Sequence, residues 1–94
     1  MKALAANTAT LIISKVNVDR IVTITSDQTT ACRLSLSKVD LQTDQTFGFS
    51  FSSVSPLNIF LPAGQELFAI STGTPNISWA PIKKGTGSNV VELV

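Results

Sequence analysis

Apolar and small polar residues alternate with a period of two along most of this chain, and this pattern constrains its fold more than any other feature. The clearest case is the segment 32–37, Cys-Arg-Leu-Ser-Leu-Ser, in which every second residue is apolar. Successive side chains of a β-strand point to opposite faces, so such a segment has one dry face and one wet face. About eight strand-like runs follow one another at the spacing typical of sandwiches and barrels, and no helical period of adequate length occurs. The sequence predicts an all-β fold, a single small antiparallel β-sandwich or barrel-like sandwich of about seven to eight short strands.

The runs and the turns between them predict the order of the strands. The turn at residues 62–65, Pro-Ala-Gly-Gln, is expected because glycine permits a positive φ. Residues 72–75, Thr-Gly-Thr-Pro, predict a tight hairpin between two strands, and the polar residues 40–46 are expected to form a loop. Pro81 places its strand toward a sheet edge, because proline has no backbone N–H to donate. The expected strands cover residues 10–16, 20–26, 32–37, 47–52, 57–61, 66–71, 76–82 and 89–94.

The apolar positions of these strands define a candidate core. The residues expected to be buried are Ile13, Val22, Ile24, Leu34, Leu36, Phe49, Ile59 and Ile70. Phe47, Phe49 and Phe51 fall on one face of their strand, where three rings would stack nucleobases or sugars if exposed. We favour the other interpretation, in which they pack against the apolar face of segment 32–37. Cys32 is interpreted as a core residue, because the chain has no His that would activate it as a nucleophile.

Composition argues against several classes of function. The chain has 94 residues, with no His, no Tyr, one Cys and six carboxylates, whereas catalytic and metal sites draw mainly on such titratable groups. We therefore expect no enzyme, no metal, no cofactor and no small-molecule substrate. The net charge of +1, with no basic run longer than Lys83-Lys84, argues against nucleic-acid binding. No segment approaches a membrane span and no signal-peptide pattern occurs, so we expect synthesis in the cytoplasm.

The low charge also bears on partners. Only 14% of the residues are charged, compared with about 25% in typical globular proteins. Either a surface rich in Ser and Thr keeps the domain soluble, or a partner covers part of the surface. The end segments 1–10 and 89–94 are richer in Ala and Val than free tails usually are, and apolar ends usually dock on something. We expect one β domain spanning 1–94, in which residues 1–9 form an N-terminal arm and both ends lie in a subunit or capsid contact.

One stretch resembles a known group of proteins. Residues 61–75, Leu-Pro-Ala-Gly-Gln-Glu-Leu-Phe-Ala-Ile-Ser-Thr-Gly-Thr-Pro, followed by Ile77-Ser78-Trp79, look like a pattern found in small β proteins of tailed-bacteriophage virions. Residues 19–26, Asp-Arg-Ile-Val-Thr-Ile-Thr-Ser, similarly resemble the first strands of such domains. The resemblance covers roughly a third of the chain, in turn motifs that many β domains share. It implies a β-sandwich that decorates a capsid or builds a head or tail accessory and contributes shape and contacts rather than catalysis.

Two functions remain open at this point. The first is a structural virion protein, made in the host bacterial cytoplasm, that attaches to the major capsid protein or another virion protein through apolar edges and termini and forms a homo-oligomer. The second is a carbohydrate- or protein-binding β-sandwich module that uses exposed aromatics. Trp79 fits either an interface anchor or a core position at one end of the sandwich. The apolar residues expected at an interface are Leu4, Leu11, Phe60, Trp79, Val91 and Leu93.

Overall fold

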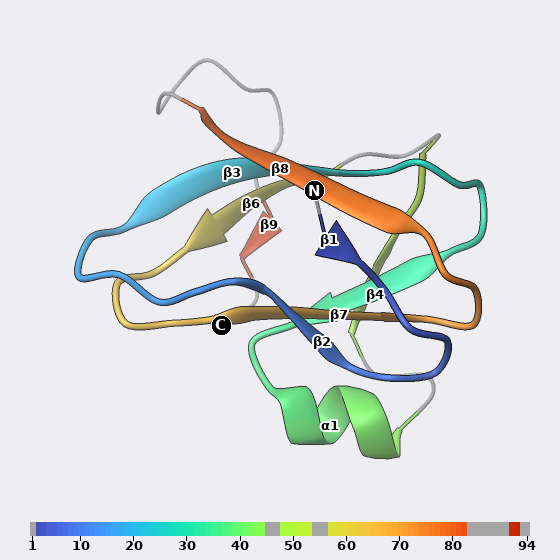
Figure 1. The fold of residues 1–94 in the computed structure, drawn as a ribbon. Coiled ribbons are helices and arrows are strands. Elements are labelled where there is room, and N and C mark those ends of the chain that lie inside the picture. Colours follow the sequence, from blue (N-terminus) through green and yellow to red (C-terminus); the bar gives the residue numbers. More distant parts are fainter. Residues whose placement is uncertain (1, 45–47, 54–56, 83–90, 93–94) are drawn as a thin grey trace.

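Two β-sheets pack face to face in the computed structural model, which describes residues 2–44, 48–53, 57–82 and 91–92 (Figure 1). One sheet has five strands in the order β1-β8-β3-β6-β9, and the other has four in the order β2-β7-β4-β5. The strands are β1 Lys2–Ala3, β2 Thr10–Ile13, β3 Arg20–Ser26, β4 Cys32–Ser35, β5 Phe49–Phe51, β6 Leu57–Leu61, β7 Leu67–Ser71, β8 Asn76–Ile82 and β9 Val91–Glu92. The all-β sandwich that the alternation predicts is confirmed. The two-residue strand β1 is additional to the expected set, whereas β9 lies within the expected strand 89–94.

Most connections carry the chain from one sheet to the other. All described strand pairs are antiparallel except β6 and β9, which run parallel. The turn at 62–65 is confirmed: the backbone N–H of Gln65 donates to the carbonyl of Pro62 at 3.2 Å, and Gly64 has a φ of 81°. The hairpin expected at 72–75 is wrong. β7 already has β2 and β4 on its two sides, so β8 joins the other sheet.

The inner faces of the two sheets form the main core. Side chains from both sheets belong to one buried cluster, among them Ile24 and Ile59 from the five-stranded sheet and Leu34 and Leu67 from the four-stranded sheet. The predicted core residues that are buried are Ile13, Val22, Ile24, Leu34, Ile59 and Ile70, while Leu36 is only partly buried against the cluster. The alternation therefore identifies most of the core correctly.

Phe49 is the exception, because 44% of its surface is exposed. It pairs with Leu34, so it projects toward the core side as expected. However, β5 is the outermost strand of its sheet, and no described strand beyond it covers the ring. Phe51 pairs with Cys32 and is 2% exposed. Phe47 lies outside the described residues.

Strand β2 is shorter than expected and contains an irregularity. Leu11 pairs with Phe68 and Ile13 with Leu67, so the register shifts around Ile12. An extra residue of this kind bends the strand and leaves two neighbouring side chains on nearly the same side. Accordingly, Ile12 packs against the main core next to the buried Ile13, although strict alternation would separate the two residues.

The outer face of the four-stranded sheet is covered by a short helix, α1 (Lys38–Thr43). The expectation of a loop at 40–46 is therefore wrong for 40–43. Ser37 caps the helix, because its side chain accepts a hydrogen bond from the N–H of Asp40. Leu41 is fully buried in a second cluster with Ala9 and Ile70. No helix in the described ranges is long and apolar enough to cross a membrane.

The part of the expected N-terminal arm that the structure describes, residues 2–9, lies against its own domain. β1 pairs with the start of β8, and the N–H of Leu4 donates to the carbonyl of Pro75 at 2.9 Å. The N–H of Ala9 then donates to the side-chain oxygen of Gln42 at 2.8 Å. Leu4 is 3% exposed and belongs to the main core. Residues 2–9 are therefore hydrogen-bonded to the segment at the start of β8 and to the helix α1.

Candidate interaction surfaces

The outer face of the five-stranded sheet has no charged side chain on its three central strands. The outward residues of β3, β6 and β8 alternate with the core residues, and paired residues project to the same face. They are Ile21, Thr23, Thr25, Asn58, Phe60, Asn76, Ser78 and Ala80, and together they are called the uncharged face below. The helix α1 lies against the other sheet, so no described helix covers this face (Figure 1).

The uncharged face combines a small apolar patch, a hydrogen-bonded polar pair and a shallow hollow. Phe60 pairs with Ile21, which places two apolar side chains next to each other at one end. Toward the other end, the hydroxyl of Thr23 donates to the side-chain oxygen of Asn58 at 2.8 Å. A hollow of about 160 Å³ follows, lined by small residues of β3 and β8 together with Trp79. This surface is suited to close approach by another protein surface.

The second feature is the outward edge of β8. β1 pairs with β8 only at Asn76 and Ile77, and no described strand pairs with that edge from Ser78 onward. Trp79 lies in this open stretch and pairs with the buried Ile24, so it belongs to the row of β8 that faces the core. It is nevertheless 38% exposed, because β8 lies at the side of the sandwich. Trp79 is therefore not a fully buried core residue, and part of it lines the hollow on the uncharged face.

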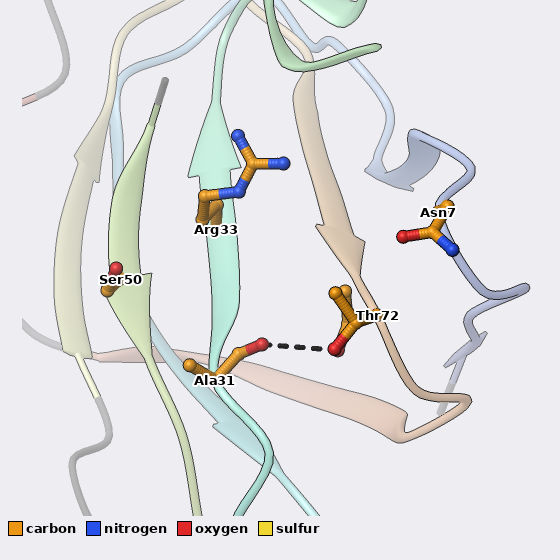
Figure 2. A pocket seen from close by; sticks show the side chains of 6 residues that line it. Asn7, Ala31, Arg33, Ser50 and Thr72 are labelled. Atoms are coloured by element: carbon orange, nitrogen blue, oxygen red, sulfur yellow. Dashed lines mark hydrogen bonds between the residues drawn. The ribbon is translucent and has the colours of Figure 1, made fainter. Parts of the chain in front are cut away.

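The third feature is a polar hollow of about 270 Å³ at the end of the four-stranded sheet (Figure 2). Two of its lining residues are joined by a hydrogen bond, in which the hydroxyl of Ser71 donates to the carbonyl of Ala31 at 3.1 Å. Arg33 stands on the outer face of β4 and donates to the backbone carbonyl of Asp44 at 2.6 Å. The remaining lining residues, Asn7, Ser50 and Thr72, expose polar side chains that make no hydrogen bond with another described residue.

Two titratable groups have shifted pKa values. Burial raises the pKa of the Cys32 thiol, against a smaller opposite effect of the hydroxyls of Ser71 and Ser26. The pKa of Asp27 is lowered, because its carboxylate accepts hydrogen bonds from the backbone N–H and the side-chain amide of Asn76, both at 2.8 Å. These two hydrogen bonds link Asp27, just after β3, to Asn76 at the start of β8. Both shifts therefore belong to groups that hold the sandwich together.

The expected interface residues differ in their exposure and in the part of the fold where they lie. Phe60 points outward as expected and is half-buried, whereas the side chain of Leu4 is enclosed in the core and is not part of the surface. Leu11 is half-buried beside Phe68 on the outer face of the four-stranded sheet. Val91 pairs with Ile59 in the backbone of β9, and Leu93 lies outside the described residues. Exposed apolar side chains that the periodicity did not identify are Val16, Val18, Val39 and Phe49.

No group of three or more His, Cys, Asp or Glu side chains that would hold a metal ion occurs within residues 2–44, 48–53, 57–82 and 91–92. Comparisons of the chain with protein-family models, curated proteins and solved structures found no match in any of the three.

Proposed function

We propose that this protein is a structural subunit that attaches to the surface of a phage virion, as a capsid decoration or a tail accessory. It acts through contacts rather than catalysis, and it docks by the uncharged face. The observation that carries the proposal is the difference between the two sheets. The helix α1 covers the outer face of the four-stranded sheet, whereas no described helix covers the outer face of the five-stranded sheet, which bears no charge on β3, β6 and β8.

The chemistry of the uncharged face favours a protein partner. Nucleic acids and anionic membrane surfaces are bound mainly through Lys and Arg, and none projects from this face. The cores of protein–protein interfaces are instead depleted of charge and enriched in aromatic residues such as Phe60. The resemblance of residues 61–79 to small virion proteins points to the capsid or tail shell as the partner. Many copies on one shell would bind stably even if each contact were weak.

Purified particles produced by the genome that encodes this chain provide the first test. Mass spectrometry of such particles should detect the chain in a fixed ratio to the major capsid protein. Particles from a strain in which the gene is deleted should then bind the purified protein again in a co-sedimentation assay. Absence of the chain from purified particles contradicts the proposed location in the virion.

A matched pair of variants tests the docking face. Thr25→Lys places one positive charge on the uncharged face, and Gln65→Lys places the same charge on the exposed turn between β6 and β7. Burying an unpaired charge in a contact is unfavourable, so Thr25→Lys should weaken attachment to the particles by at least about tenfold. Gln65→Lys should attach like the wild type. Equal attachment of both variants, with both folded, contradicts docking through this face.

A second candidate function is carbohydrate binding. It is favoured by the polar hollow, where Asn7, Ser50 and Thr72 offer free amide and hydroxyl groups beside Arg33. Titration of the protein with neutral and acidic oligosaccharides, followed by calorimetry, tests it. Saturable binding that is lost in Thr72→Ala supports this function, and no heat with any of the sugars contradicts it.

A further inference from the structure

The open edge of β8 has a defined set of hydrogen-bonding groups. Along a strand, the N–H and C=O of one residue point to one side, and those of the next residue point to the other side. The carbonyl of Pro75 accepts from Leu4 on the side of β1, and the carbonyl of Asn76 accepts from Asp27 on the side of β3. Ile77 therefore directs its groups toward β1, while Trp79 and Pro81 direct theirs toward the open edge.

This alternation explains why a proline is tolerated in β8. Pro81 pairs with Val22 in a regular ladder that runs from Ile77 to Ile82 without a shift in register. Because the backbone groups of Pro81 point away from β3, its missing N–H removes no bond from that ladder. The open edge consequently presents one donor, the N–H of Trp79, and two acceptors, the carbonyls of Trp79 and Pro81.

We propose that two copies of this chain associate through their β8 edges, in an antiparallel pair with its two-fold axis at Ala80. In this register Trp79 lies opposite Pro81 of the second copy, so each Trp79 N–H donates to a Pro81 carbonyl across the axis. The pairing is self-complementary, as a two-fold interface requires. A register with Trp79 opposite Trp79 would place Pro81 of the second copy beside Ile77, where Lys2 pairs, whereas the pairing about Ala80 involves only residues 78–82 of each copy.

The side chains along this edge fit a second copy. Residues 78–81, Ser-Trp-Ala-Pro, carry no charge, so the paired stretch places no like charges opposite each other. Directly opposite residues project to the same face, so the exposed ring of Trp79 lies beside the ring of Pro81 from the other copy. At the axis, two exposed Ala80 side chains meet, and they are small enough to allow the strands to pair.

The dimer joins two five-stranded sheets into one continuous sheet and brings their uncharged faces side by side. Dimerisation is measured in solution without particles, so its failure leaves the proposed attachment to a virion unaffected. Equally, a dimer that never binds particles would contradict the proposed function and leave this inference standing.

Matched cysteine variants test the register. At Ala80 the two Cα atoms are expected about 4.5 Å apart, as in a pair without hydrogen bonds, which is within the range that a disulfide spans. Ala80→Cys should therefore form a disulfide-linked dimer under mild oxidation. Ser78→Cys, four residues from its counterpart across the axis, and Ala63→Cys, in the exposed turn, should stay monomeric. The natural Cys32 is buried and does not interfere. Cross-linking of all three variants alike, or of none, overturns the register.

Sedimentation equilibrium tests the association itself. The interface is small, so we expect dissociation constants of about 1 to 100 µM, with the emission of Trp79 shifting to the blue as the concentration rises. Ala80→Lys places two like charges at the axis and should abolish the dimer, whereas Ala63→Lys should not. Pro81→Ala restores a donor on each copy and should tighten the dimer at least about fivefold. A wild-type protein that remains monomeric at 1 mM overturns the proposal.

Discussion

Phe49 and Phe51 are the same residue type, on the same strand and the same face, yet they should differ widely in their contribution to stability. Phe51 is 2% exposed, and replacing such a residue by Ala typically lowers the free energy of unfolding by about 3 to 5 kcal/mol, because a cavity is left behind. Phe49 is 44% exposed and covers the edge of the core. Its truncation removes only part of a burial worth about 1.5 to 3 kcal/mol and leaves no closed cavity, so the loss should be about 1 kcal/mol.

Urea denaturation of the two variants, followed by circular dichroism, gives both free energies directly. For a domain of this size, 1 kcal/mol corresponds to about 4 to 8 °C in melting temperature. Phe51→Ala should therefore melt roughly 12 to 40 °C lower than the wild type, and Phe49→Ala about 4 to 8 °C lower. Similar losses for the two variants, or a larger loss for Phe49→Ala, would refute the placement of β5 at the edge of the sheet.

Four further outcomes follow from the structure. Gly48→Ala should lower the free energy of unfolding by about 2 kcal/mol or more, because an added Cβ would lie 2.8 Å from Leu41 and φ is 105°. Gly64→Ala has open space around the added Cβ, so it should lower the free energy of unfolding by only about 1 kcal/mol in the same urea titration. Leu4→Ala should lower the free energy of unfolding by about 2 to 5 kcal/mol, and an unchanged value would show that residues 2–9 are a free arm. Because the pKa of Asp27 is lower in the folded state, its contribution is present above the unfolded pKa and is lost as the pH falls through the folded one, so the wild type should lose more stability between pH 5 and pH 2 than Asp27→Asn. The raised pKa of Cys32 acts in the opposite sense, because its contribution to stability is complete below the unfolded pKa of about 8.5 and is lost as the pH rises through the folded pKa. Alkali should therefore destabilise the wild type more than Cys32→Ala. Native Cys32 should also react slowly with thiol reagents.

The sequence predicts the long strands well, because their pattern reflects burial on one face. The expected strands 20–26, 57–61 and 76–82 coincide with β3, β6 and β8. Each of these strands lies in the five-stranded sheet with one face on the core and the other not covered by the described helix, which is the situation that produces a clear period of two. The expectation that Pro81 lies toward a sheet edge holds for the part of β8 beyond β1, although β8 is second in the strand order.

Features that depend on contacts distant in the sequence were missed. The helix α1 has six residues, too few for a helical period, and it is held by the cap at Ser37 and by Leu41 packing against Ile70. The expected hairpin at 72–75 failed because sheet membership depends on which neighbours a strand already has. Phe49 has a core-type pattern, but alternation does not reveal that its strand is outermost.

The candidate surfaces were predictable only in part. Alternation places Thr23, Thr25 and Phe60 on the outward rows of their strands, whereas the low overall charge fits both a Ser- and Thr-rich soluble surface and one that a partner covers. That these rows lie side by side as one face follows from the strand order, which local patterns do not contain. Leu4 was expected at an interface on the basis of an apolar terminus, and the same apolar character instead places it in the core of its own domain.

Electron cryomicroscopy of the particles produced by the encoding genome tests the central claim most directly. We expect density for the sandwich on the capsid or tail shell, with the uncharged face of β3, β6 and β8 against the shell and the helix α1 directed outward. A sandwich bound through α1, with the uncharged face open to solvent, would contradict the docking surface. Particles without any density for the chain would contradict the proposed function itself.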